Sequence, residues 1–100
     1  MTAVRLARRA ERDLRRTDAW WRDNRPAAPE LFLSEVGDAL RLLRGAPAAG
    51  PLHEIRPDDG VRRVLLPQTR FHAYYRLDRH DEVVVIVAFW STQRGRTPML

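Results

Sequence analysis

The segment from Gly60 to Leu100, GVRRVLLPQTRFHAYYRLDRHDEVVVIVAFWSTQRGRTPML, is the most informative part of the chain about its fold. It contains three apolar runs, at Val61 to Leu66, Phe71 to Leu77 and Val83 to Trp90, joined by short polar segments. Alternating apolar and polar residues over such short runs are typical of strands with one buried face. We therefore predict an antiparallel meander. Its last run is apolar almost throughout, so this strand should be central in the sheet or covered on both faces.

Arginine is concentrated on these strands and on the segment that follows them. Residues 60–77 include four arginines and no acid, and the last thirteen residues include two arginines and again no acid. All 18 basic residues of the chain are arginines, and its formal net charge is +5. A guanidinium group stays charged and presents a planar fork that suits phosphates and carboxylates. The chain should therefore attract nucleic acid or an acidic protein, and charge alone does not choose between them.

Composition predicts one folded domain over residues 1–100, with a tail from about residue 91. With 44% hydrophobic and 31% charged residues the chain should be globular, and without cysteine it has no disulfide. The N-terminus lacks the apolar segment of a signal peptide, and no apolar run is long enough to cross a bilayer. His53 and His80 lack metal-ligand spacing. We expect a cytoplasmic protein that uses no membrane, metal or cofactor.

Upstream of the meander, periodicity predicts a short strand at Thr2 to Leu6 and then two helices. The first runs from Ala7 to Asn24 and ends before Pro26, because proline disfavours helical geometry in the preceding residue. The second runs from Pro29 to Arg44, with Gly45 as its cap. Their short connection makes them an antiparallel hairpin. Apolar residues that match these periods form the predicted core: Leu14, Trp21, Phe32, Val36, Leu40, Phe71, Tyr75 and Ile86.

The remaining elements complete an α+β architecture. Leu52 to Arg56 is predicted as an edge strand that ends in the turn Pro57-Asp58-Asp59-Gly60. Within the run from Phe71 to Leu77, the odd-numbered residues should face the helices, and the even-numbered residues should face the other side. The whole is predicted to be a helical hairpin packed on one face of a mostly antiparallel sheet.

The order of strand, helical hairpin and strands, with the segments GVRRVLL, RFHAYYRLD, VVVIVAFW and RGRTP, resembles the RelE/ParE superfamily of bacterial type II toxins. The resemblance covers nearly the whole chain. It implies a toxin held inactive by a co-encoded antitoxin that wraps it, in a heterotetramer or a higher complex. It also implies one of two activities. These are ribosome-dependent mRNA cleavage, as in the RelE branch, and inhibition of DNA gyrase, as in the ParE branch.

Several residues match the RelE-like ribonucleases. Arg63, and less closely Arg62, stands where those enzymes carry a basic residue on the strand before the tyrosine-rich one. Their Y-R-x-x-Y pattern falls on Phe71 to Tyr75, so that His72 replaces the arginine. If the chain is a ribonuclease, the resemblance makes the catalytic candidates Arg63, His72, Tyr74, Arg76 and Arg94.

Other positions depart from that pattern. A C-terminal arginine is kept as Arg94 or Arg96, but no tyrosine follows Tyr75, and Ser91 stands where similar tails carry a histidine. RNA cleavage by 2′-hydroxyl attack needs a base, an acid and a cation near the developing charge. The departures favour ParE-like inhibition by binding, in which the target-binding residues would be Arg62, Arg63, Arg76, Arg94 and Arg96.

Two simpler readings stay open. The strand arginines would also serve as the solvated face of a sheet, where charge discourages edge-to-edge pairing. Trp20 lies beside the apolar face of the first helix, where it would either contact an antitoxin or cover the edge of the hairpin. A third function, a non-toxic nucleic-acid-binding domain, would use the same basic surface.

Overall fold

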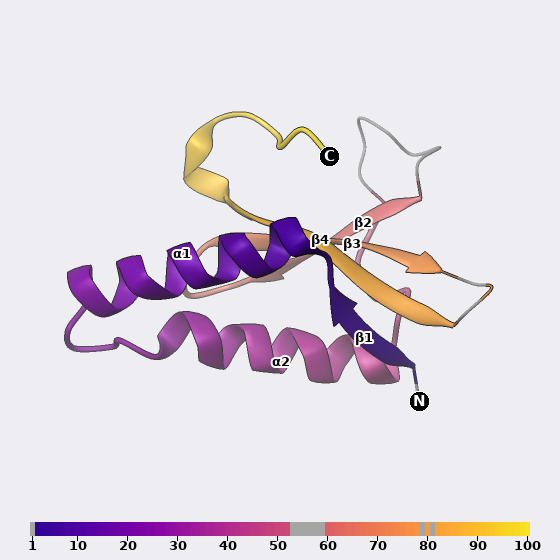
Figure 1. Ribbon diagram of the computed structural model, residues 1–100, viewed down its shortest axis with the longest axis horizontal. Helices are drawn as coiled ribbons and strands as arrows, with labels where there is room; N and C mark the ends of the chain where they lie inside the picture. Colours follow the sequence, from indigo (N-terminus) through magenta and orange to yellow (C-terminus); the bar gives the residue numbers. More distant parts are fainter. Residues whose placement is uncertain (1, 53–59, 79, 81) are drawn as a thin grey trace.

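The computed structural model describes residues 2–52, 60–78, 80 and 82–100. The four strands form one sheet in the order β1-β4-β3-β2, with β1 parallel to β4 and the other neighbours antiparallel (Figure 1). Both helices pack into one apolar cluster with the inner face of the sheet, which confirms the predicted α+β architecture. The elements are β1 (Ala3–Leu6), α1 (Arg8–Asn24), α2 (Leu31–Gly45), β2 (Val61–Leu66), β3 (Phe71–Asp78), β4 (Val83–Ser91) and the short 3-10 helix η2 (Thr92–Arg94).

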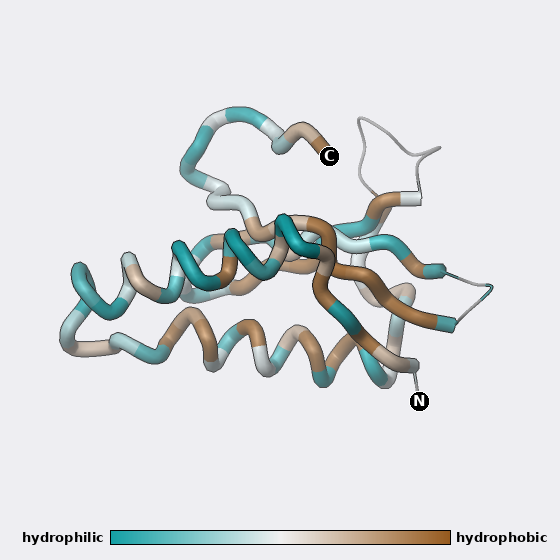
Figure 2. The backbone as a smooth tube through the Cα atoms, viewed as in Figure 1, coloured by the Kyte–Doolittle hydropathy of each residue, from teal (hydrophilic) through white to brown (hydrophobic). Residues whose placement is uncertain are grey.

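The apolar strand β4 lies inside the sheet, between β1 and β3, as its composition predicts. Figure 2 shows this strand as largely hydrophobic, whereas α1 is mostly hydrophilic. The N-terminal strand joins it in parallel, with Leu6 opposite Ile86. The next residue, Ala7, donates its N–H to the Ile86 carbonyl at 2.9 Å. The start of α1 is thereby fixed against the middle of the sheet.

A β-bulge in β4 changes which residues face the helices. Tyr74 is opposite Ala88 and Tyr75 is opposite Ile86, so Val87 is the extra residue. Ile86 belongs to the cluster under the helices, whereas Ala88 belongs to a second cluster with Tyr74. An extra residue in one strand disrupts the simple two-residue alternation and increases local twist. The bulge therefore turns the end of β4 relative to its beginning.

Phe32 of α2 is at the centre of the main core. Its ring packs edge-to-face with Phe71 and Phe89, with ring centroids 5.2 and 5.8 Å away. Edge-to-face geometry is a favoured arrangement for aromatic rings. Four of the predicted core residues are buried, namely Phe32, Val36, Tyr75 and Ile86. The other four are partly buried and pack against them: Leu14, Trp21, Leu40 and Phe71.

The C-terminal tail folds back over the outer face of the sheet (Figure 1). There Val61, Tyr74 and Ala88 form a second buried cluster, against which Trp90 and Leu100 pack. This covering is the reason that a face with several arginines also contains a buried tyrosine. The strand periodicity correctly predicts that Tyr74 faces away from the helices, but not that the tail covers it.

The predicted start of the second helix at Pro29 is wrong. Two tight turns occupy the connection between the helices, because Ala28 donates to the Arg25 carbonyl at 3.0 Å and Leu31 donates to the Ala28 carbonyl at 3.3 Å. These turns use residues that a longer helix would need, so α2 begins at Leu31.

The predicted cap at Gly45 is also wrong, since Gly45 is the last helical residue. Ala46 ends the helix with a φ of −144° and donates its N–H to the Leu42 carbonyl at 2.8 Å. A chain that leaves in an extended conformation needs no left-handed residue, and therefore no glycine.

The predicted edge strand from Leu52 to Arg56 is described at one residue only. Leu52 forms an isolated antiparallel bridge with Arg62, and residues 53–59 lie outside the described residues. Gly60 has a φ of +66°, a left-handed conformation that glycine adopts without steric cost. Gly60, the one residue of the predicted turn that the structure describes, therefore has a backbone conformation typical of a turn glycine.

Candidate functional site

One cleft lies on the outer face of the sheet, against the tail. It has a volume of about 540 Å³ and is lined by strand and tail residues that include Arg63, His72, Tyr74, Trp90 and Arg96. We call it the tail cleft. Three of the catalytic candidates meet here, namely Arg63 of β2 with His72 and Tyr74 of the neighbouring strand β3. Arg96 of the tail lines the same cleft.

Tyr74 is held tightly within this cleft. Tyr74 is only 1% exposed, because it also belongs to the second core cluster. The Arg63 guanidinium donates to the Tyr74 hydroxyl at 3.5 Å, the long limit of a hydrogen bond. The His72 ring packs edge-to-face on Tyr74, with ring centroids 5.9 Å apart. The residues that line the cleft in the described part of the chain include no carboxylate.

Trp90 organises the arginines beside the tail cleft. Its indole N–H donates to the Arg96 carbonyl at 2.8 Å, which fixes the tail. The guanidinium carbons of Arg94, Arg96 and Arg9 lie 4.1, 5.5 and 5.9 Å from the ring centroid. At these distances the ring quadrupole attracts each cation. Arg94 and Arg96 are therefore held near one indole, although Arg94 itself lines a different cleft.

The structure places the other two predicted target-binding arginines outside both clefts. Arg62 donates to the carbonyls of Gly50 and Ala48 at 2.8 and 3.4 Å, so it anchors the loop before β2. Arg76 lies on β3, opposite Val61 of β2 and Val85 of β4. A part in target binding for these two arginines stays a prediction.

The loop that Arg62 anchors also fixes a buried tyrosine. The Gly50 N–H donates to the Tyr75 hydroxyl at 2.9 Å. A Cβ atom at Gly50 would lie 2.5 Å from the Arg63 carbonyl oxygen, so only glycine fits this close approach. Burial raises the pKa of Tyr75 above 10.0, although the Gly50 N–H and the charge of Arg62 act in the opposite direction.

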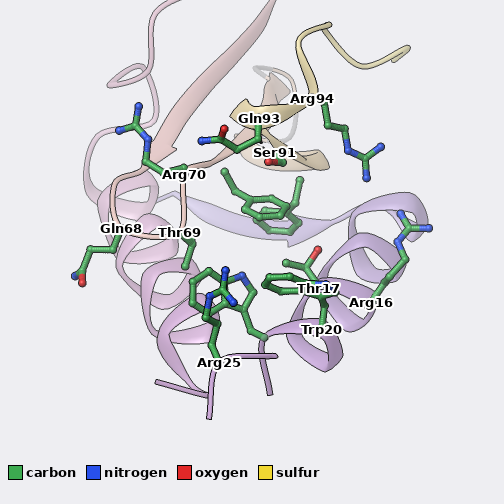
Figure 3. A pocket seen from close by; sticks show the side chains of 13 residues that line it. Arg16, Thr17, Trp20, Arg25, Gln68, Thr69, Arg70, Ser91, Gln93 and Arg94 are labelled. Carbon is green, nitrogen blue, oxygen red and sulfur yellow. Dashed lines mark hydrogen bonds between the residues drawn. The ribbon is translucent and has the colours of Figure 1, made fainter. Parts of the chain in front are cut away.

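A second cleft lies where the helical hairpin meets the end of the sheet. Its volume is about 700 Å³, and its lining includes Arg16, Trp20, Trp21, Arg25, Arg70 and Arg94. We call it the hairpin cleft. Figure 3 shows arginines from α1, from the turn between β2 and β3, and from η2 placed around its opening. Trp20, predicted to cover the hairpin or contact an antitoxin, is 46% exposed here.

Two buried carboxylates that sequence reasoning missed bind residues that line the hairpin cleft. Glu35, 5% exposed, accepts from the backbone N–H groups of Gln68 and Thr69 at 2.9 and 2.7 Å, and from the Thr69 hydroxyl at 2.8 Å. Asp13, 6% exposed, accepts from the Phe89 N–H at 3.1 Å. A sequence signal was present, because each acid falls within the apolar stripe of its helix. Buried carboxylates need such donors.

Comparison with known proteins now identifies the family. Residues 4–95 match the family model described as ParE toxin of type II toxin-antitoxin system, parDE. The chain belongs to the ParE toxin family. The predicted membership of the RelE/ParE superfamily is therefore confirmed. A search of curated proteins finds no match.

Solved structures share the fold of this ParE-family chain. A chain from the chromosomal ParDE TA system from P. aeruginosa superposes with a TM-score of 0.71 at 19% identity, over 93% of this chain and 98% of that one. A chain of the intact E. coli RelBE toxin-antitoxin complex superposes with a TM-score of 0.60 at 14% identity, over 94% and 100%. In the described part of the chain, no helix is long and apolar enough to span a membrane.

Proposed function

We propose that this ParE-family toxin arrests bacterial growth by binding DNA gyrase, and that a cognate antitoxin neutralises it. Membership of the ParE family supports the toxin assignment. The two structural neighbours come from a ParDE system and a RelBE toxin-antitoxin complex, which supports an antitoxin as partner. The choice between binding and catalysis depends on the tail cleft.

The composition of the tail cleft favours binding over catalysis. Cleavage of a phosphodiester needs one group to take a proton, another to give one, and a cation for the developing charge. Arg63 and Arg96 would supply cations. Tyr74 is 1% exposed, and the cleft has no carboxylate among the described residues, which leaves His72 as the cleft side chain whose chemistry best suits a general base or acid. This shortage is the observation that supports the proposal.

A RelE-like ribosome-dependent mRNA endoribonuclease is the second candidate. It is supported by the convergence of Arg63, His72 and Tyr74 in one cleft, with Arg96 at the same place. In that case His72 would act as the base or the acid, and the reaction would depend strongly on it. A non-toxic nucleic-acid-binding domain is the weakest candidate, because it leaves the match to a toxin family unexplained.

Expression in a bacterial host separates these functions. We expect induction to arrest growth and alter plasmid supercoiling while total mRNA stays intact. His72→Ala should keep the arrest, whereas Arg63→Gln combined with Arg96→Gln should weaken it. General acid–base catalysis contributes about 10²–10⁴-fold, so a ribonuclease should nearly lose its toxicity with His72→Ala. Rapid mRNA cleavage that His72→Ala abolishes, with unchanged supercoiling, would overturn the proposal.

A further inference from the structure

The outward side of α1 carries a row of arginines that lies apart from both clefts. Its members are Arg8, Arg12 and Arg15, which are four and three residues apart and therefore lie on one side of the helix. All three are exposed, and together with Glu11 they line a groove of about 450 Å³. We call these three residues the arginine row. With a rise of about 1.5 Å per residue, the row extends over about 10 Å of the helix axis.

The charge of the arginine row is not neutralised within the described part of the chain. No ion pair joins any of its three members to a carboxylate there. Other arginines of α1 are paired, since Arg16 lies 2.9 Å from Asp13 and Arg22 lies 3.1 Å from Asp18. Among the described residues, Glu11 is the one acid that lines the groove. The groove therefore keeps an excess of positive charge for an anionic partner.

The arginine row works against the stability of its own helix. Like charges four residues apart on a helix repel each other, as Arg8 and Arg12 do. Arg8 is also the first residue of α1, where positive charge opposes the helix dipole. A surface that only had to stay in water would be better served by interspersed charges of both signs. A partner that supplies the missing negative charge accounts for this local conflict.

The lining of the groove indicates the kind of partner. Every described side chain that lines it is charged, whereas the centre of a protein interface is usually apolar and aromatic. In the described part of the chain it includes no aromatic ring on which unpaired bases could stack. Insertion of α1 into a lipid surface is disfavoured, because Leu14 and Trp21 of its apolar side pack against the core. These features favour the regularly charged backbone of a nucleic-acid duplex.

We infer that the arginine row of α1 binds the phosphate backbone of duplex DNA. This inference rests on the proposed function, because DNA gyrase brings the chain to a DNA duplex. Duplex DNA also suits α1 better than duplex RNA does. The major groove of DNA is about 12 Å wide and can receive one side of a helix, whereas the major groove of an RNA duplex is too deep and narrow.

The length of the row matches several phosphates. Duplex DNA carries one negative charge per about 1.7 Å of its axis, so about six phosphates lie within the length of the row. Each guanidinium group can donate two parallel hydrogen bonds to one phosphate. Phosphate contacts carry no sequence information, so the row holds the chain on DNA of any sequence.

The test is a fluorescence-anisotropy titration of a short labelled DNA duplex of mixed sequence with the purified full chain, at several salt concentrations. We expect binding that weakens as salt rises, because each bound phosphate releases counterions. Three further probes are single-stranded DNA of the same sequence, duplex RNA and vesicles of anionic lipid. Equal or tighter binding of any of these, or no binding of duplex DNA, would overturn the inference.

The variant that tests the row combines Arg8→Gln, Arg12→Gln and Arg15→Gln. Loss of three phosphate contacts should reduce the slope of log affinity against log salt by about 2.7, and should weaken binding at low salt by about tenfold or more. The variant should melt at no lower temperature than the parent, because it loses repulsion between like charges within α1.

The matched control combines Arg22→Gln, Arg41→Gln and Arg44→Gln. It loses the same charge as the row variant, but from exposed arginines outside the groove. The control should therefore bind duplex DNA with nearly the salt dependence of the parent. Equal losses in the control and the row variant would show that net charge alone attracts the DNA, and the inference would fail.

A second pair of variants tests the groove in the opposite direction. Glu11→Gln removes the acid from the groove, so it should tighten binding of duplex DNA. Glu30→Gln removes an exposed acid outside the groove and should tighten binding less. The same affinity in both variants would contradict binding at the row.

Gyrase assays keep this inference separate from the proposed function. If the chain binds duplex DNA through the row but leaves supercoiling by gyrase unchanged, the proposed function fails and the DNA contact stands. If the chain inhibits gyrase but does not bind duplex DNA, the inference alone fails.

Discussion

At the scale of single residues, two buried carboxylates fix the elements that form the hairpin cleft. Glu35 joins α2 to the turn between β2 and β3, and Asp13 joins α1 to the end of β4. Glu35 accepts from two backbone N–H groups and Asp13 accepts from one, and the N–H groups of Thr69 and Phe89 would otherwise be buried without an acceptor. These contacts connect elements that are far apart in the sequence, so no local pattern reveals the partner.

Replacement of Glu35 should be costly. Glu35→Ala leaves two backbone N–H groups and the Thr69 hydroxyl without their acceptor, and we expect the free energy of unfolding to fall by about 2–4 kcal/mol. Urea denaturation followed by circular dichroism measures this change. Glu30→Ala is the matched control, because Glu30 is exposed, and its effect should stay within about 0.5 kcal/mol. A similar small effect at Glu35 would show that the turn does not depend on this contact.

The buried hydroxyl of Tyr75 should make the folded chain less stable at high pH. Burial raises the pKa of its hydroxyl above 10.0 in the folded chain. As the pH rises past 10.0, the unfolded chain therefore releases this proton first, and the folded state loses stability relative to it. Denaturation at a series of pH values should show stability falling above that pH, with a shallower fall in Tyr75→Phe. Equal slopes for the two proteins would contradict this origin.

At the scale of elements, the sequence predicts most of the fold because each helix and strand has a clear apolar period. The strands β2, β3 and β4 occur where alternation places them, and α1 ends before Pro26 as predicted. The bulge at Val87 could not be predicted, because it depends on pairing between β3 and β4. The packing of the tail over Tyr74 could not be predicted either. It depends on contacts of Trp90 and Leu100 with a sheet face that looks polar in the sequence.

The candidate site was predictable in part for the same reason. Strand alternation and the family resemblance indicated Arg63, His72 and Tyr74, and these residues do line one cleft. The roles of Arg62 and Arg94 were not predictable, because their contacts are long-range. Arg62 binds carbonyls of the loop before β2, and Arg94 stacks on Trp90 while lining the hairpin cleft.

The second helix should contribute a large share of the stability through Phe32. This residue is fully buried between Phe71 and Phe89, so Phe32→Ala removes both aromatic contacts and leaves a cavity. We expect a loss of about 3–5 kcal/mol in the free energy of unfolding, measured by chemical denaturation. Leu42→Ala on the same helix is the control, because Leu42 is exposed and its loss should matter little. A melting temperature within a degree or two of the parent for Phe32→Ala would contradict the assigned core.

At the scale of the whole molecule, the two clefts divide the basic surface between different faces of the sheet. The tail cleft lies on the outer face, and the hairpin cleft lies where the helices meet the sheet. Two residues of the hairpin cleft, Ser91 and Arg94, connect the two clefts. Ser91 also lines the tail cleft, and Arg94 stacks on Trp90, which lines the tail cleft. The two clefts therefore adjoin at the end of β4.

The net charge should also affect how fast the antitoxin associates. A chain with a formal charge of +5 attracts an acidic partner over distances that salt shortens. We expect the association rate constant, measured by stopped-flow fluorescence, to fall as ionic strength rises. A rate constant that does not change with salt would show that steering by charge plays no part.

Supercoiling of relaxed plasmid by purified DNA gyrase, measured in the presence of the purified chain, tests directly whether the chain inhibits gyrase. We predict inhibition that increases with the concentration of the chain, persists in His72→Gln and weakens in the Arg63→Gln, Arg96→Gln variant. Arg44→Gln, which changes the same kind of charge outside both clefts, should inhibit as the parent does. Undiminished gyrase activity at chain concentrations that cleave mRNA in a translating extract would contradict inhibition of gyrase as the toxic activity.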